Sequence, residues 1–91
     1  MKRILLSKHA LERFLERDID ENKIKKYLQK GIIIPNYEMG RMLCIYKDKK
    51  SYITLVIEEG KNQIVIITGF PSSAWEIQKY KKVKKYGRKK N

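Results

Sequence analysis

The second half of this 91-residue chain contains three runs of β-branched and aromatic residues, and their close succession constrains the fold more than any other feature. The runs are Arg41 to Lys47, Ser51 to Glu58 and Gln63 to Phe70. Asp48-Lys49 and the segment 59–62 are expected to form the turns between them. Connections this short join antiparallel neighbours, because a parallel crossover needs about a dozen residues or more. The pattern therefore predicts an antiparallel β-meander.

Side chains alternate along a strand, so the register divides the predicted meander into two faces. We place Lys47 opposite Lys50 and Glu58 opposite Gln63. The more apolar face, which is expected to meet helices, then carries Met42, Cys44, Ile53, Leu55, Ile57, Ile64 and Ile66. The second face carries Arg41, Leu43, Ile45, Tyr52, Thr54, Val56, Val65 and Ile67. It is too apolar to lie bare, so we expect part of it to be covered.

The first half of the chain shows a helical period. Ser7 is a suitable N-cap for a helix that reaches about Arg17. The apolar stripe of this helix consists of Ala10, Leu11, Phe14 and Leu15. A second helix is expected from an N-cap at Asp20 to Gly31, a residue that suits the position just after a helix. The following run, Ile32 to Ile34, ends at Pro35 and is expected at a sheet edge.

A third helix is expected after Pro71. Ser73-Ala-Trp-Glu76 is a capping box, and Trp75 and Ile77 are expected to pack. The predicted fold class is therefore α+β, with two N-terminal helices packed on a three- to four-stranded antiparallel β-meander and a basic C-terminal helix. Residues 1–71 form the body of this single domain, and residues 72–91 form its basic helix and tail.

The charge of the chain narrows its possible partners. Lysine and arginine number 22 against 10 aspartates and glutamates, which gives a net charge of +12. Such an excess indicates a polyanionic partner, such as nucleic acid, an anionic membrane surface or an acidic protein. The single cysteine, Cys44, excludes an internal disulfide and fits a reducing cytoplasm. No apolar run is long enough for a signal peptide or a membrane span, so a cytoplasmic protein without a membrane partner is expected.

The only histidine, His9, lies on the first predicted helix, with Arg13 and Arg17 four and eight residues later. The three side chains form a ridge along one flank of the apolar stripe. This set suits metal-independent RNA cleavage, in which a base assists attack of the 2′-hydroxyl on the phosphate and cations stabilise the phosphorane. Alternatively, His9 is a surface or capping group and the arginines pair with nearby carboxylates. The spacing fits both interpretations. The carboxylates in question are Glu12, Glu16 and Asp20.

Other kinds of chemistry are poorly supported. One histidine, one cysteine and scattered carboxylates make a poor metal site, so no metal and no cofactor are expected. Cys44 is expected to serve as a small core residue and not as a nucleophile. The five glycines match no phosphate-binding loop.

The C-terminal region is the strongest compositional signal for a nucleic-acid partner. Tyr80 and Tyr86 are interleaved with basic residues, which can neutralise phosphates while the rings stack on bases. The expected contact residues are Lys79, Lys81, Lys82, Lys84, Lys85 and Arg88. The alternative is a solvated tail that only raises solubility.

Three segments of the chain resemble a known group of proteins. They are Ser7-x-His9-Ala10-x-x-Arg13-x-x-x-Arg17-x-Ile19, the Lys-rich helix ending at Gly31, and Ile66-Ile67-Thr68-Gly-Phe70-Pro71. The pattern resembles an uncharacterised bacterial and archaeal domain family grouped with the RelE/ParE-like toxins, in the set of small nucleases that includes barnase and colicin ribonuclease domains. The resemblance runs from Ser7 to Pro71. It implies helices on a four-stranded antiparallel sheet, with an RNA-binding cleft framed by the sheet and the first helix.

The resemblance also implies roles for particular residues. His9 is the expected acid/base, Arg13 and Arg17 are expected phosphate ligands, and Arg41 is a further candidate on the opposing strand. An acidic antitoxin that masks the cleft is an implied partner. The sequence thus predicts a toxin-like, metal-independent endoribonuclease that acts on RNA. The alternatives are a non-catalytic nucleic-acid-binding module and a ParE-like protein-targeting toxin whose antitoxin covers the sheet face carrying Tyr52. No oligomeric state is predicted.

Overall fold

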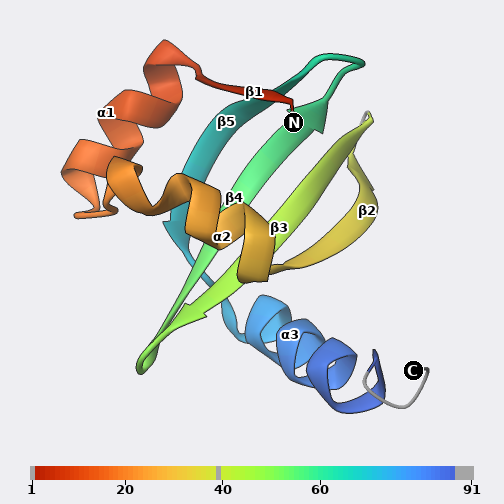
Figure 1. Cartoon of the computed structure of the whole chain (residues 1–91). Helices are drawn as coiled ribbons and strands as arrows, with labels where there is room; N and C mark the ends of the chain where they lie inside the picture. Colours follow the sequence, from red (N-terminus) through yellow and green to blue (C-terminus); the bar gives the residue numbers. More distant parts are fainter. Residues whose placement is uncertain (1, 39, 88–91) are drawn as a thin grey trace.

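The computed structural model describes residues 2–38 and 40–87. Its elements are β1 (Arg3–Leu6), α1 (Lys8–Glu16), the 3₁₀ turn η1 (Glu21–Lys23), α2 (Ile24–Lys30), β2 (Ile32–Glu38), β3 (Arg41–Asp48), β4 (Ser51–Glu59), β5 (Gln63–Pro71) and α3 (Ala74–Gly87). Within the described residues, the five strands form one sheet in the order β1-β5-β4-β3-β2 (Figure 1).

The predicted fold class, two N-terminal helices on a purely antiparallel meander, is wrong because the sheet is mixed. The strands β2 to β5 are antiparallel neighbours, but β1 precedes both helices and pairs in parallel with β5. Arg3 lies opposite Gln63, and Leu6 lies opposite Ile66. Four residues are too few to show an alternating period, and the partner of β1 is the last strand in the sequence. For these two reasons no local sequence pattern could reveal the pairing.

The turns of the meander also differ from the prediction. Asp48 pairs with Ser51, so the turn between β3 and β4 is formed by Lys49 and Lys50, and Lys49 has a positive φ of 58°. Glu58 pairs with Val65 and not with the predicted Gln63. Both corrections move a pairing by two residues, which is the period of a strand, so the side chains near these turns stay on their predicted faces. Between Val56 and Ile57 the pairing with β5 shifts by one further residue, so that Ile57 lies opposite Ile66 but Val56 lies opposite Thr68.

The division of the strands into two faces is confirmed by burial. On the face toward the helices, the core contains Ala10, Phe14, Ile19, Ile24 and Tyr27 against Cys44, Tyr46, Leu55, Ile57 and Ile66. Met42, Ile53 and Ile64 pack partly against this core. The helices α1 and α2 thus cover the predicted apolar face, as Figure 1 shows.

The buried stripe of α1 is narrower than predicted. Ala10 and Phe14 are buried, but Leu11 is 40% exposed and Leu15 is 83% exposed. The helix packs along β5 near the edge of the sheet, where β1 is the only further strand. A helix in that position buries only the side that faces β5 and leaves the far half of a broad apolar stripe in solvent.

The second predicted helix is divided into η1 and α2, and Gly31 ends it for a different reason than expected. Gly31 has an extended backbone, with φ of −74°. A Cβ atom there would lie 2.6 Å from the Tyr27 carbonyl oxygen and 2.9 Å from the Cys44 sulfur. The residue is therefore required for the close approach of α2 to β3 and not for a left-handed conformation.

The second face of the sheet is covered by the chain itself. Leu43, Ile45, Thr54 and Val56 are buried on this side, where α3 contacts β2 and β3. The Tyr80 ring of α3 meets the Tyr52 ring of β4 edge-on, with 5.4 Å between the centroids. The helix α3 thus covers part of the face that carries Tyr52 and Thr54, and binding of an antitoxin to this face stays a prediction.

The start of α3 is held by the Glu76 half of the predicted capping box. The Ser73 amide donates to Glu76 Oε1 at 2.7 Å, and the Glu76 side chain is buried at 2% exposure. The hydroxyls of Ser72 and Thr54, which lie 2.7 Å apart, join this start to β4. In the described part of the chain, no helix has the length and apolar character required to cross a membrane.

Candidate nucleic-acid interface

The position of α1 is set by Ser7, which links the helix to β5. Its side-chain oxygen accepts a hydrogen bond of 3.0 Å from the Ala10 amide, which caps the helix. The same hydroxyl donates a 3.0 Å hydrogen bond to the Ile67 carbonyl. One side chain thus fixes both the start of α1 and its position beside β5.

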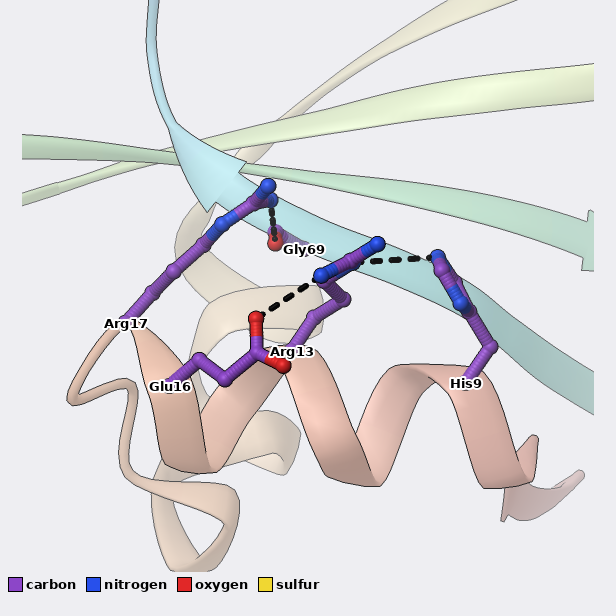
Figure 2. A network of polar contacts seen from close by, with 5 residues as sticks. All are labelled: His9, Arg13, Glu16, Arg17 and Gly69. Carbon is purple, nitrogen blue, oxygen red and sulfur yellow. Dashed lines mark hydrogen bonds and ion pairs between the residues drawn. The ribbon is translucent and has the colours of Figure 1, made fainter.

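Three side chains extend from one flank of α1 toward β5, and we call this set the α1 ridge: His9, Arg13 and Arg17 (Figure 2). Arg13 lies in the middle of the ridge. Its Nε donates to His9 Nε2 at 3.4 Å, and its Nη1 lies 2.7 Å from Glu16 Oε2. To accept this bond, Nε2 of His9 needs a free lone pair, which the tautomer with its proton on Nδ1 provides.

Arg17 is held by the backbone of β5. Its Nη1 donates a 2.8 Å hydrogen bond to the Gly69 carbonyl (Figure 2). Gly69 lies beyond Ile66, the last residue of β5 that pairs with β1. The guanidinium therefore binds an edge of the sheet that β1 does not reach. A guanidinium has five N–H donors, so this bond still leaves donors that can face a phosphate.

Arg41 is not brought to the ridge. It lies on β3, and β4 separates that strand from β5. Its neighbour Met42 packs toward the helices, so Arg41 points to the opposite face of the sheet. There its Nε lies 3.7 Å from Glu58 Oε2 in an exposed ion pair. The predicted fourth member of the catalytic set is thus separate from the other three.

The predicted basic contacts lie on α3, at the end of the molecule away from the start of α1 (Figure 1). Lys79, Lys81, Lys82, Lys84 and Lys85 are exposed, and Arg88 lies outside the described residues. The basic helix therefore does not share a surface with His9.

Next to α3, two aromatic rings in contact are flanked by an ammonium group on each side, an arrangement that sequence reasoning missed. The Lys84 Nζ lies 5.7 Å from the Tyr80 ring centroid. The Lys47 Nζ lies 5.7 Å from the Tyr52 ring centroid, and the two rings are themselves in contact. Lys47 pairs with Tyr52 across β3 and β4. This pairing depends on the register, which the predicted turn placed two residues away.

The described residues offer little for metal or thiol chemistry. No group of three or more histidine, cysteine, aspartate and glutamate side chains among them could hold a metal ion. Cys44 is fully buried, and burial raises the pKa of its thiol to about 12. Its sulfur donates a 3.2 Å hydrogen bond to the Tyr27 carbonyl. Cys44 is a core residue.

Comparison with known proteins decides the family of the chain. Residues 6–71 match the sequence profile of the family described as "Domain of unknown function (DUF4258)". The chain belongs to the DUF4258 family. No curated protein and no solved structure matches it significantly. The DUF4258 match carries no link to the RelE/ParE-like toxins, so that relationship stays a prediction.

The DUF4258 match separates the two candidate regions. It contains the α1 ridge and ends at Pro71, the last residue of β5. The basic helix α3 follows that boundary. The matched residues thus cover α1, α2 and the strands β2 to β5.

A cavity of about 340 Å³ lies beside Arg17 within the DUF4258 domain. Its walls come from the turn after α1, from Tyr27 and from the hairpin between β3 and β4. Lys23 and Asp48, whose Nζ and Oδ2 atoms are 3.8 Å apart, also line it. Burial, and then the charges of Asp48 and Asp20, raise the pKa of Tyr27. The lining comes from three separate segments of the chain, which is why no local motif revealed it.

Proposed function

We propose that this protein is a metal-independent endoribonuclease of the small, toxin-like kind. The observation that carries the proposal is the contact between His9 and Arg13, whose Nε2 and Nε atoms lie 3.4 Å apart on an exposed flank of α1. A neutral imidazole with a lone pair on Nε2 is the form that a general base requires. The net charge of +12 supports a polyanionic substrate. A cytoplasmic location and an acidic antitoxin partner belong to the same proposal.

The proposed reaction uses the RNA's own 2′-hydroxyl as the nucleophile. Its proton passes to His9 Nε2 while its oxygen attacks the adjacent phosphorus. The bond from phosphorus to the 5′ oxygen breaks, the leaving oxygen takes a proton from water, and the product ends in a 2′,3′-cyclic phosphate. The guanidinium groups of Arg13 and Arg17 stabilise the charge on the phosphorane.

The geometry supports this sequence of events in two ways. The 3.4 Å bond between Arg13 and His9 is longer than the usual hydrogen-bond distance, and the 2.7 Å ion pair between Arg13 and Glu16 is exposed, so Arg13 can turn to a bound phosphate at modest cost. The cavity of about 340 Å³ beside Arg17 falls within the size range of small-molecule sites, and because Asp18, Asp20 and Asp48 line it, it suits a base or ribose better than a phosphate.

Cleavage of an end-labelled single-stranded RNA in EDTA tests the proposal. Pure wild-type protein should yield products with 2′,3′-cyclic phosphate ends, and His9→Ala should slow cleavage by about 10²- to 10⁴-fold. Lys8→Ala is the matched control, since Lys8 is an exposed neighbour on α1 outside the ridge. Equal cleavage by wild type and His9→Ala would exclude His9 as the base. Thermal unfolding of each variant shows whether the fold is kept.

A non-catalytic nucleic-acid-binding module is the second candidate. The observation that favours it is the bond from Arg17 to the Gly69 carbonyl, which gives this arginine a structural role. In that case α3 supplies the affinity and the wild-type protein retains RNA without cutting it. Replacing Lys81 and Lys84 by glutamine should then weaken binding. It should also lower the slope of log affinity against log salt by about one for each phosphate that is no longer neutralised.

A further inference from the structure

The only tryptophan of the chain, Trp75, is half in solvent, although it was expected to pack. It lies in the first turn of α3, and 48% of it is exposed. Together with Gln78, Lys79 and Lys82 of the same helix it lines a shallow recess of about 250 Å³. We call these four residues the α3 strip. About half of this indole is available for contact with a ligand, and two lysines lie beside it.

The packing of α3 fixes the direction in which the strip points. Glu76, the neighbour of Trp75, is buried, and Tyr80 lies against the Tyr52 ring of the sheet. At about 100° per residue, Lys79 and Lys82 lie close to the direction of Trp75, whereas Tyr80 points well away from it. The helix is thus held by one side and presents the α3 strip on the other.

We propose that the α3 strip binds single-stranded nucleic acid, with one base stacked on the Trp75 indole and the flanking phosphates bound by Lys79 and Lys82. This inference rests on the proposed RNA function and names a binding site for it. The lysines lie about 6 Å and 10.5 Å from Trp75 along the helix axis, both toward the C-terminal end of α3, which places two cations in line with the ring for the phosphates of one strand. Stacking on an indole is tolerant of sequence, because every base has a π-face.

The charge around the strip selects this occupant. No aspartate or glutamate follows Glu76 in the sequence. An anionic membrane is also a polyanion, but a helix that binds a membrane surface needs a broad apolar face. The α3 strip carries a single apolar side chain, and Ile77 and Tyr80 of the same helix are partly buried. One ring beside two cations matches a base and its phosphates better than it matches a lipid surface.

Tryptophan fluorescence tests the site directly, because all of the signal comes from Trp75. The probe is a labelled 2′-O-methyl oligouridylate, which lacks the attacking hydroxyl and so is bound without being cut. Its fluorescence anisotropy reports binding, and the Trp75 emission reports stacking. Both signals should saturate together, with the Trp75 emission quenched.

Variants make the test quantitative. Trp75→Ala should weaken binding of the oligonucleotide by about 5- to 100-fold, and Trp75→Phe should weaken it less, because a smaller ring still stacks. Lys79→Gln and Lys82→Gln should each lower the salt slope by about one. Leu15→Ala is the control, since Leu15 is an exposed apolar residue on α1. It should bind as wild type does.

The outcomes separate this inference from the proposed function. Binding with unchanged Trp75 emission and full affinity in Trp75→Ala would overturn the α3 strip, while cleavage that depends on His9 would still support the ribonuclease. Quenching by the oligonucleotide without any RNA cleavage would support the strip and overturn the ribonuclease. A shift of Trp75 emission with anionic phosphatidylglycerol vesicles, but none with the oligonucleotide, would overturn the strip in favour of a membrane surface.

Discussion

Arg17 donates a 2.8 Å hydrogen bond to the carbonyl oxygen of Gly69, and this bond joins the end of α1 to the edge of β5 that β1 leaves open. The residue that sequence reasoning assigned to phosphate binding is therefore also a structural link. Ser7 makes the corresponding contact at the other end of the helix, through the Ile67 carbonyl. The side chains of the two cap residues of α1 thus bind edge carbonyls that a neighbouring strand would otherwise satisfy.

Arg17→Ala should destabilise the fold as well as weaken RNA binding. Removal of the bond to Gly69 should lower the free energy of unfolding by about 1 kcal/mol, and the melting temperature by about 4–8 °C. Arg13→Ala is the comparison, because Arg13 bonds only to exposed partners on its own helix, and its removal should cost about 0.5 kcal/mol or less. Thermal denaturation by circular dichroism measures both. Equal melting temperatures for the two variants would show that the bond to Gly69 contributes nothing.

Gly69→Ala should be poorly tolerated because the added methyl group enters the core. Its Cβ would lie 2.5 Å from Phe14 Cε1 and 3.0 Å from Leu55 Cδ2, and both partners are buried. Overpacking of this kind costs about 1–3 kcal/mol. Gly60→Ala is the control, since its nearest contacts lie at an ordinary 3.6 Å.

The same clash can be checked by a double-mutant cycle in urea denaturation. Phe14→Leu removes the ring atom that the new methyl group would meet. The loss in the free energy of unfolding of the double variant Phe14→Leu/Gly69→Ala should therefore be smaller than the sum of the losses of the two single variants. Strict additivity would mean that the methyl group is accommodated elsewhere, for example by a movement of β5.

Much of the local structure was predictable from alternation and spacing. The alternation of side chains along the strands placed Cys44, Leu55 and Ile66 on the face that the helices cover. The predicted turn between β3 and β4 was misplaced by one residue, but this moves the strand pairing by two residues, so the side chains of these two strands keep their faces. The parallel pairing of β1 was not predictable. It joins a four-residue strand to the last strand of the chain, and a pairing between such distant segments depends on the whole fold.

The candidate site divides in the same way. The i, i+4 spacing of His9 and Arg13 predicts their contact, and the structure shows it. Their roles stay predictions. The bond from Arg17 to Gly69 is tertiary and left no sequence signal. The exposure of Trp75 could have been predicted from the sequence. Trp75 and Ile77 point about 160° apart on a helix, so a helix that packs on one sheet cannot bury both.

Substitution of Leu15 should change the stability of the fold far less than substitution of Phe14, although the two residues are adjacent and both apolar. Leu15→Gln should change the free energy of unfolding by about 0.5 kcal/mol or less, because 83% of Leu15 is already in solvent. Phe14→Ala should cost about 3–5 kcal/mol, since Phe14 is 1% exposed and the change leaves a cavity under α1. Urea denaturation gives both values. A large decrease in Leu15→Gln would place Leu15 in an interface, such as one between copies of the chain.

The stability of the fold should fall as the pH rises above 9, because of Cys44. Burial raises the pKa of this thiol from 9.0 to about 12, so above pH 9 the unfolded chain releases its proton while the folded chain keeps it. The unfolded state then binds fewer protons, and the free energy of unfolding decreases with pH until the folded thiol also ionises near pH 12. Between pH 8 and pH 10 the expected decrease from this thiol is about 1 kcal/mol. Urea denaturation at the two pH values measures it.

Cys44→Ala separates the thiol from other alkaline effects. The substitution should lower stability at pH 8, because it removes the bond from the sulfur to the Tyr27 carbonyl, but its further decrease between pH 8 and pH 10 should be smaller than that of wild type. Tyr27, whose pKa burial also raises, is present in both proteins and acts as an internal reference. The folded thiol should resist a thiol reagent at pH 8 and react once urea unfolds the chain. An equal decline with pH in both proteins would assign the alkaline effect to groups other than Cys44.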